Sequence, residues 1–240
     1  MKNLYFPLFF FCAMSLSAQT IYNPNPRYWE PGVFLGAVNY SGDVAEKNIH
    51  FSETRLGYGA FTRYFLSKKF ALRANLYGGS IAGDDANSKD PGLRSRSFRF
   101  STKILELAVG GEWHMWAKDR YSDTGIHQHF TSPYLFLGAG GVFTSVKVEY
   151  NGAPKDRNTF VVAPLPEKKS RQQFLIPIMG MGVRTDINEN LVLGAEIGMR
   201  PMLSDYLDGV SVNGNPGRKD WYYFGGATLS YILSKPKALN

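Results

Sequence analysis

Cysteine is almost absent from this chain: Cys12 is the only one in 240 residues. It lies in a segment with the pattern of a secretory signal peptide, in which Lys2 precedes the apolar run 4–13 and small residues lead to Ala18. We expect cleavage after Ala18, which leaves Gln19 as the first residue and removes Cys12. The mature protein then has neither a disulfide nor thiol chemistry, and its stability comes from other interactions.

Long apolar runs are also missing. After residue 18 the sequence has no run that approaches the ~20 residues of a membrane-spanning helix, although 44% of the chain is hydrophobic and 15% is aromatic. These residues are spread along the chain in short alternating runs. If the protein crosses a membrane, a closed set of β-strands is the other way to satisfy its backbone hydrogen bonds.

Acidic residues are the minority charge, with 20 Asp and Glu against 27 Lys and Arg and a formal net charge of +7. In a secreted chain this excess favours anionic lipid or an acidic partner. The sequence carries no nucleic-acid-binding motif, so we expect no nucleic-acid partner. We also expect no small-molecule substrate.

Eight segments alternate between apolar and polar residues with period two, and turn-forming residues bound each one. One face of these segments is apolar, and the other carries glycines and single charges, which is typical of lipid-facing and lumen-facing sides. We therefore predict an all-β fold, an eight-stranded antiparallel transmembrane β-barrel of the outer-membrane type; a soluble β-sandwich is the alternative. The expected strands are 32–40, 55–65, 70–79, 100–116, 133–148, 173–185, 191–199 and 221–233.

The lengths of the connections favour the barrel over the sandwich. Connections 66–69 and 186–190 are tight, whereas the first, third, fifth and seventh connections are long and polar, as in barrels with short periplasmic turns and long outer loops. The fourth connection, 117–132, is the exception because it should be short. Aromatic clusters near the strand ends fit interfacial girdles: Tyr28, Trp29, Trp113, Trp116, Trp221, Tyr222 and Tyr223. The expected organisation is a signal peptide 1–18, a periplasmic segment 19–31, a barrel 32–233 and a periplasmic tail 234–240.

Several stretches between residues 32 and 211 resemble the PorG family, small outer-membrane barrels of the type IX secretion system in Bacteroidetes. Each stretch is short, and their order and spacing carry the resemblance: 35–43 (LGAVNYSGD), 71–76 (ALRANL), 83–85 (GDD), 104–107 (ILEL), 133–138 (PYLFLG) and 204–208 (SDYLD). The resemblance implies an outer-membrane protein that binds, from the periplasmic side, a ring of the lipoprotein PorK and PorN. In that family the barrel is not known to be the cargo channel.

Charged residues collect on the inward faces of the predicted strands. Arg55 and His114 share these faces with six residues that we expect to form a network of buried ion pairs, since buried charge requires a partner: Arg63, Arg73, Glu106, Glu112, Glu196 and Arg200. An eight-stranded barrel is just wide enough for side chains to fill. We therefore expect an anchor and not a conduit.

The sequence predicts no catalytic, cofactor-binding or metal-binding residues, and no enzyme activity. Glu112 and His114 could be combined with Ser101, but a triad needs the nucleophile within reach of the histidine. His127 and His129 with Asp123 do not have a zinc spacing. Asp84, Asp85 and Asp90 lack the fixed loop of a calcium site.

We expect a structural component of a secretion machine that docks a periplasmic ring. The alternative is a free-standing small barrel that acts as an adhesin or a channel for hydrophobic molecules, with a lipid-modifying enzyme as a distant third. The first predicts function on the periplasmic turns and the second on the outer loops. The residues expected to face the partner are Lys68, Lys118, Asp119, Arg120, Asp123 and Asn188.

Overall fold

The computed structural model describes residues 27–41, 53–88, 91–120, 126–150, 171–202, 207 and 220–233. The expected signal peptide and C-terminal tail lie outside the described residues. Within them the chain forms eight strands: β1 (Tyr28–Ser41), β2 (Arg55–Phe65), β3 (Phe70–Asp84), β4 (Phe98–His114), β5 (Thr131–Tyr150), β6 (Arg171–Asp186), β7 (Leu191–Pro201) and β8 (Trp221–Tyr231).

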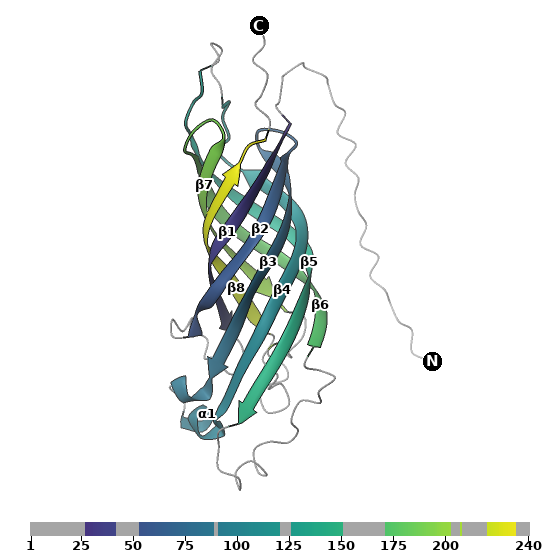
Figure 1. The fold of residues 1–240 in the computed structure, drawn as a ribbon, viewed down its shortest axis with the longest axis vertical. Helices are drawn as coiled ribbons and strands as arrows, with labels where there is room; N and C mark the ends of the chain where they lie inside the picture. Colours follow the sequence, from purple (N-terminus) through teal and green to yellow (C-terminus); the bar gives the residue numbers. More distant parts are fainter. Residues whose placement is uncertain are drawn as a thin grey trace, which may run out of the picture.

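The eight strands form one closed antiparallel barrel, which confirms the predicted fold. Each strand pairs with the next along the chain, and β1 closes the sheet by pairing with β8 from Gly32↔Ser230 to Ser41↔Trp221. One end of the barrel carries the connections β2–β3, β4–β5 and β6–β7, together with the start of β1 and the end of β8; we call it the turn end. The opposite end is the loop end (Figure 1).

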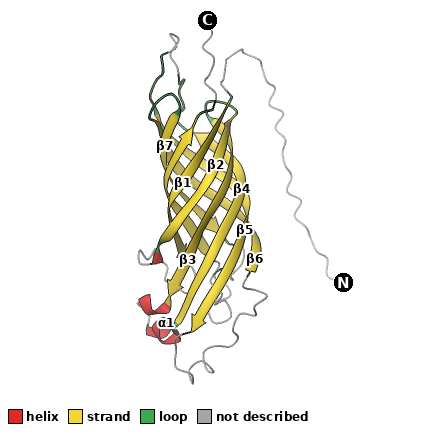
Figure 2. Ribbon diagram, in the orientation of Figure 1, coloured by secondary structure: helices red, strands yellow, loops and turns green. Residues whose placement is uncertain are grey.

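Two short helical segments lie at the loop end, between β3 and β4: η2 (Asp85–Asn87) and α1 (Pro91–Arg96) (Figure 2). Asp84 caps the first of them, because its side chain accepts a hydrogen bond from the backbone of Ala86. None of the helices formed by the described residues is long and apolar enough to cross a membrane.

Several strand boundaries differ from the sequence expectation. β1 begins at Tyr28 and not at residue 32, so part of the expected periplasmic segment 19–31 belongs to the wall. Pro31 led the sequence analysis to place the start of the strand too late. In the structure Pro31 pairs with Thr62 near the turn end, and the alternation of buried and exposed side chains continues through Glu30. β3 and β4 also extend into the expected loop 80–99, because Asp84 pairs with Arg99.

The outward face of the barrel carries a continuous apolar band. On β4 the band runs from Leu105 to Trp113, with Leu107 and Val109 more than half exposed. With a strand rise of about 3.3 Å and a tilt of about 40°, this stretch spans about 20 Å along the membrane normal, close to the ~25 Å band of outer-membrane barrels. Exposed aliphatic residues on other strands extend the band around the barrel: Val33, Leu35, Leu56, Leu72, Leu76, Leu137, Leu175, Leu193, Ile197 and Leu229.

Aromatic side chains border this band at the turn end. Trp29, Phe70 and Trp113 are exposed there, and the Trp29 ring packs against Tyr64 at a tilt of 40° with centroids 4.8 Å apart. Such a girdle fits the interface between lipid and water. The prediction was wrong for Tyr28 and Tyr222, which are buried, because alternation turns both of them into the lumen.

Side chains fill the lumen in three layers. At the loop end, Leu207 and Met202 join an apolar cluster with residues from several strands, and the backbone carbonyl of Leu207 accepts a hydrogen bond from Thr102. Charged residues fill the middle layer. At the turn end, Tyr28 and Phe65 stack with centroids 4.5 Å apart, and the residues around them leave a cavity of about 20 Å³, room for about one water molecule.

A pair of lysine substitutions on the same face of β4 tests the membrane band. Leu107→Lys places a charge near the middle of the band and should destabilise the barrel by about 2–4 kcal/mol, whereas Ser101→Lys, on the loop-end side of the band, should cost about 1 kcal/mol or less. The free energy of unfolding in urea, measured in phospholipid vesicles, checks both values. Equal costs for the two variants would contradict the assignment of this face to lipid.

Candidate functional site

The middle of the lumen is organised around Glu112. Its carboxylate accepts hydrogen bonds from Arg63 Nε at 2.8 Å and from Arg73 Nη1 at 2.7 Å. Arg73 also donates to Glu196, with Nη2 2.8 Å from Oε1. All four side chains are buried. They meet because β2, β3 and β4 are neighbours, while β7 faces them across the barrel.

The same network continues toward the turn end through Glu30. This carboxylate lies 3.1 Å from Arg63 Nη1 and 2.7 Å from Arg184 Nη2. Asp186 extends the chain, with its Oδ1 3.7 Å from Arg184 and 3.1 Å from Arg120. We call this set the lumen ladder; its members, in order from the turn end, are Arg120, Asp186, Arg184, Glu30, Arg63, Glu112, Arg73 and Glu196.

The lumen ladder is electrically neutral, since its four arginines balance its four carboxylates. Hydroxyl groups complete the coordination of the carboxylates: Ser230 donates to Glu30 at 2.7 Å, and Tyr134 donates to Glu196 at 2.7 Å. Aromatic faces cover the cations as well, and the Arg63 guanidinium lies 4.3 Å from the Phe61 ring centroid. Each charge of the ladder therefore has a partner of opposite sign, while Arg120 Nε, Arg184 Nε and Asp186 Oδ2 form no hydrogen bond among the described residues.

A separate ion pair lies closer to the loop end. Arg200 Nε is 3.1 Å from Glu106, which also accepts a hydrogen bond from the Tyr222 hydroxyl at 2.8 Å. The Arg200 head group has room because the neighbouring residue on the same face is Gly198. A Cβ at that position would overlap Arg200 Nη1 and lie 2.9 Å from Phe136 Cζ.

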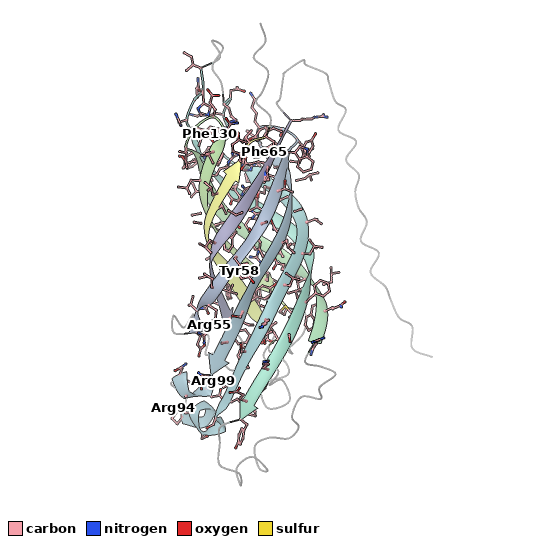
Figure 3. All side chains as sticks on the ribbon, viewed as in Figure 1. Arg55, Tyr58, Phe65, Arg94, Arg99 and Phe130 are labelled. Carbon is pink, nitrogen blue, oxygen red and sulfur yellow. The ribbon has the colours of Figure 1, made fainter. Side chains whose placement is uncertain are left out.

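The structure brings the six expected lumen residues together in these two groups. Glu112 and Glu196 pair with Arg63 and Arg73, and Glu106 pairs with Arg200. The placement of Arg55 was wrong: it is exposed at the loop end, beyond the enclosed part of the barrel (Figure 3).

Sequence reasoning missed Glu30, Arg120, Arg184 and Asp186. Alternation could have found Arg184, because it shares its face of β6 with Ile176 and Ile178. The late start expected for β1 concealed Glu30. Arg120 lies in a connection, where periodicity gives no signal.

The structure separates the catalytic group that was weighed from the sequence, while Asp90 and Asp123 of the two weighed metal groups lie outside the described residues. Ser101 is exposed on the outer face, whereas His114 is buried in the lumen with Nε2 3.2 Å from Glu112, so the barrel wall separates them. Asp85 accepts a hydrogen bond from the Phe98 backbone, and Asp84 pairs with Arg99. In the part of the chain that the structure describes, no group of three His, Cys, Asp or Glu could hold a metal ion.

The turn end holds the residues that we expected to face a partner. Lys118 and Asn188 are exposed, and Asp119 pairs with Lys68 at 2.6 Å. The prediction for Arg120 was wrong, since it turns into the barrel and forms part of the lumen ladder. Asp123 lies outside the described residues.

The β4–β5 connection folds over the turn end of the barrel. The backbone of Gln128 donates to the carbonyl of Arg120, and His129 Nδ1 lies 3.1 Å from the Asp186 carbonyl oxygen. Phe130 and Phe65 lie at this end (Figure 3), and both line the small cavity there. The described parts of this connection, 115–120 and 126–130, therefore pack against the turn end, and Arg120 joins them to the ladder.

Exposed apolar side chains lie on several segments at the turn end. Trp116 and Ile126 are each 68% exposed, Leu233 is 64% exposed, and Ile187 is 48% exposed. Together with Leu66, these residues form what we call the turn-end patch. Large exposed apolar side chains on several turns at one end make that end a candidate interaction site.

The model of the family described as "Domain of unknown function (DUF6089)" matches residues 2–238. The chain belongs to this family. None of the curated proteins with which it was compared matches it.

Solved structures of outer-membrane proteins are similar to this DUF6089 member at low sequence identity. The attachment invasion locus protein Ail of Yersinia pestis is 11% identical with a TM-score of 0.44, over 86% of this chain and 99% of Ail. The N-terminal β-barrel domain of Pseudomonas aeruginosa OprF is 12% identical with a TM-score of 0.45, over 86% and 98%. Neisserial surface protein A is 11% identical with a TM-score of 0.46, over 85% and 96%.

The Glu106–Arg200 pair offers a test of whether the lumen is dry. Arg200→Leu leaves Glu106 buried without its cation and should lower the free energy of unfolding by about 3–5 kcal/mol. The double variant Glu106→Leu/Arg200→Leu removes both charges and should recover part of the loss. Adding Tyr222→Phe should recover more stability, because it removes the buried hydroxyl that lost its acceptor when Glu106 was replaced. Urea unfolding in vesicles measures all three, and a cost below about 1 kcal/mol for Arg200→Leu would show that water screens the pair.

Proposed function

We propose that this protein is an outer-membrane anchor in a protein secretion machine of the type IX kind, and that its turn end docks a periplasmic ring of partner proteins. The filled lumen is the observation that carries the proposal. A neutral ladder of buried ion pairs occupies the interior, and apolar clusters close both ends. A barrel without a conduit acts through its ends.

The proposed orientation puts the turn end in the periplasm. Outer-membrane barrels have short periplasmic turns and longer outer loops, and connections 66–69 and 187–190 are the short ones here. The start of β1 and the end of β8 lie at the same end, which suits a chain delivered from the periplasm. This orientation exposes the turn-end patch to periplasmic proteins.

The partner fits the chemistry of the turn end and the resemblance to the PorG family. The turn-end patch supplies apolar contacts, and the exposed charges of Lys118 and Asp119 lie beside it. A central apolar area with a polar rim is typical of protein interfaces. By resemblance, the partners are the lipoprotein PorK and PorN, which form the ring.

A free-standing adhesin would use the loop end instead, and a channel for hydrophobic molecules would need an open interior. Arg63 and Arg73 are buried in the middle of the lumen, so a channel would require the ladder to break. The anchor therefore remains the function that the interior favours.

Single cysteines test the orientation, since we expect the mature chain to be free of thiols. Arg94→Cys, on exposed α1 at the loop end, should react with a membrane-impermeant maleimide on intact cells. Lys118→Cys, exposed at the turn end, should react only after the outer membrane is permeabilised. The reverse pattern would contradict the orientation.

Substitutions in the turn-end patch test the docking role. Ile126→Asp/Ile187→Asp places two carboxylates where an apolar interface would need to desolvate them, so co-purification of the ring proteins from native membranes should fall at least about tenfold. Secretion should fall with it, while the heat-dependent gel shift of the folded barrel stays unchanged. The matched control is Ala86→Asp, which adds a carboxylate to an exposed residue at the loop end and should retain the partners.

Two outcomes would overturn the proposal. If the double variant retains the ring at wild-type yield, the turn-end patch is not the dock. If the wild-type barrel brings no periplasmic protein through purification, the secretion role is wrong.

A further inference from the structure

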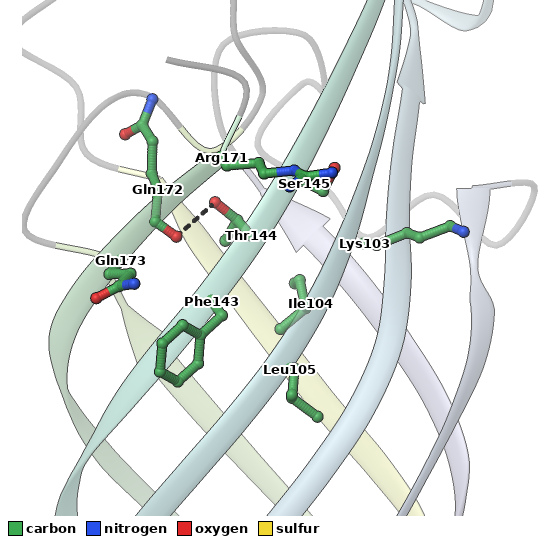
Figure 4. A pocket seen from close by; sticks show the side chains of 9 residues that line it. All are labelled: Lys103, Ile104, Leu105, Phe143, Thr144, Ser145, Arg171, Gln172 and Gln173. Carbon is green, nitrogen blue, oxygen red and sulfur yellow. Dashed lines mark hydrogen bonds between the residues drawn. The ribbon is translucent and has the colours of Figure 1, made fainter. Parts of the chain in front are cut away.

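A cavity of about 340 Å³ lies in the barrel wall on β4, β5 and β6, at the border of the apolar band that is nearer to the loop end (Figure 4). The proposed function does not use it, because it lies away from the turn end. The residues that line it combine apolar side chains, amides, hydroxyls and two cations: Lys103, Ile104, Leu105, Phe143, Thr144, Ser145, Arg171, Gln172 and Gln173.

The strand register arranges the outward-facing residues of this cavity in two rows. Lys103 pairs with Ser145, which in turn pairs with Arg171, so these three form one row across three strands. Leu105 pairs with Phe143 in the adjacent row, on the side of the apolar band. A cationic row therefore lies directly above an apolar floor.

The two cations are close enough to share one anion. Neighbouring strands are about 4.8 Å apart, so Lys103 and Arg171, two strands apart, start about 10 Å from one another. Their long side chains can both reach a group at the level of Ser145, whose hydroxyl lies between them in the row. A phosphate oxygen is the acceptor that ammonium and guanidinium groups favour in such a position.

The carboxylates of the described residues do not pair with these two cations. Among the described residues, neither Lys103 nor Arg171 takes part in an ion pair, whereas Arg99, further along β4, pairs with Asp84 at 3.3 Å. On β5, Glu149 is four residues beyond Ser145, a separation of about 13 Å along the strand. Lys147 lies between them and adds a third positive charge, since it pairs with Ser101 beside Lys103.

Single cations at a membrane interface are common, because lysine and arginine extend toward water from the edge of the lipid. The cavity distinguishes this place from such an edge. Its floor of Leu105 and Phe143 is half exposed and belongs to the lipid-facing band, so a ligand here must present an apolar chain beside its anionic group. A lipid with a phosphorylated headgroup has both parts.

We propose that this cavity binds a phosphorylated lipid of the outer leaflet. Lys103, Arg171 and Ser145 contact the headgroup phosphate, and one acyl chain lies against Leu105 and Phe143. The inference shares the orientation of the barrel with the proposed function but not the secretion role. A variant that loses lipid binding but keeps the periplasmic ring proteins, or one that loses the ring proteins but keeps lipid binding, therefore separates the two proposals.

Native mass spectrometry of the purified barrel in detergent tests the site, with bisphosphorylated lipid A as the probe and the same glycolipid without its phosphates as the comparison. The wild-type barrel should prefer the phosphorylated lipid by about tenfold, the factor that two partly exposed charge-assisted contacts can supply. Lys103→Gln/Arg171→Gln should abolish this preference. The matched control, Arg27→Gln/Lys69→Gln, removes two exposed cations at the turn end and should keep it.

Three results would overturn the proposal. Equal binding of both lipids by the wild-type barrel would mean that acyl chains alone occupy the groove. An unchanged preference in the Lys103/Arg171 variant would place the phosphate elsewhere. Complete displacement of the lipid by millimolar inorganic phosphate would show a site for the free anion, without a role for the apolar floor.

Discussion

Pairing between β1 and β8 closes the sheet, and the other properties of this protein depend on that closure. A closed sheet leaves no strand edge unpaired, so the barrel can lie in lipid without buried polar backbone. Closure also creates an interior that is sealed from the membrane. Side chains on alternate positions of every strand must enter this interior and find partners there, whatever their charge.

The filling of the interior follows from that constraint. Arg63 and Arg73 carry charge into a space where an unpaired cation would be costly, and Glu112 lies between them. Glu30, Glu112 and Glu196 each meet arginines from two strands, so the ladder joins strands across the barrel as well as along the sheet. The buried ladder fills the middle of the lumen, which suits the proposed anchor better than a channel.

Closure also separates the two ends and gives them different chemistry. At the turn end, the described parts of the β4–β5 connection are fixed to Asp186 by Arg120 and present Trp116 and Ile126 to the outside. The wall near the loop end instead carries the cations Lys103 and Arg171 above an apolar floor. The proposed protein binding at one end and the proposed lipid binding near the other are compatible, because the barrel separates the two sites.

The sequence by itself determined the eight strands, the lipid-facing and lumen-facing sides and the six principal lumen charges, because alternation with period two survives in every strand. It did not determine the start of β1 behind Pro31, or the inward turn of Arg120, because proline and connections interrupt that periodicity. The pairing of Glu30 on β1 with Arg184 on β6, and of Arg73 on β3 with Glu196 on β7, joins residues far apart in the chain. Only the closed tertiary structure decides these pairs, since they depend on which strands face each other across the lumen and on the register that aligns them.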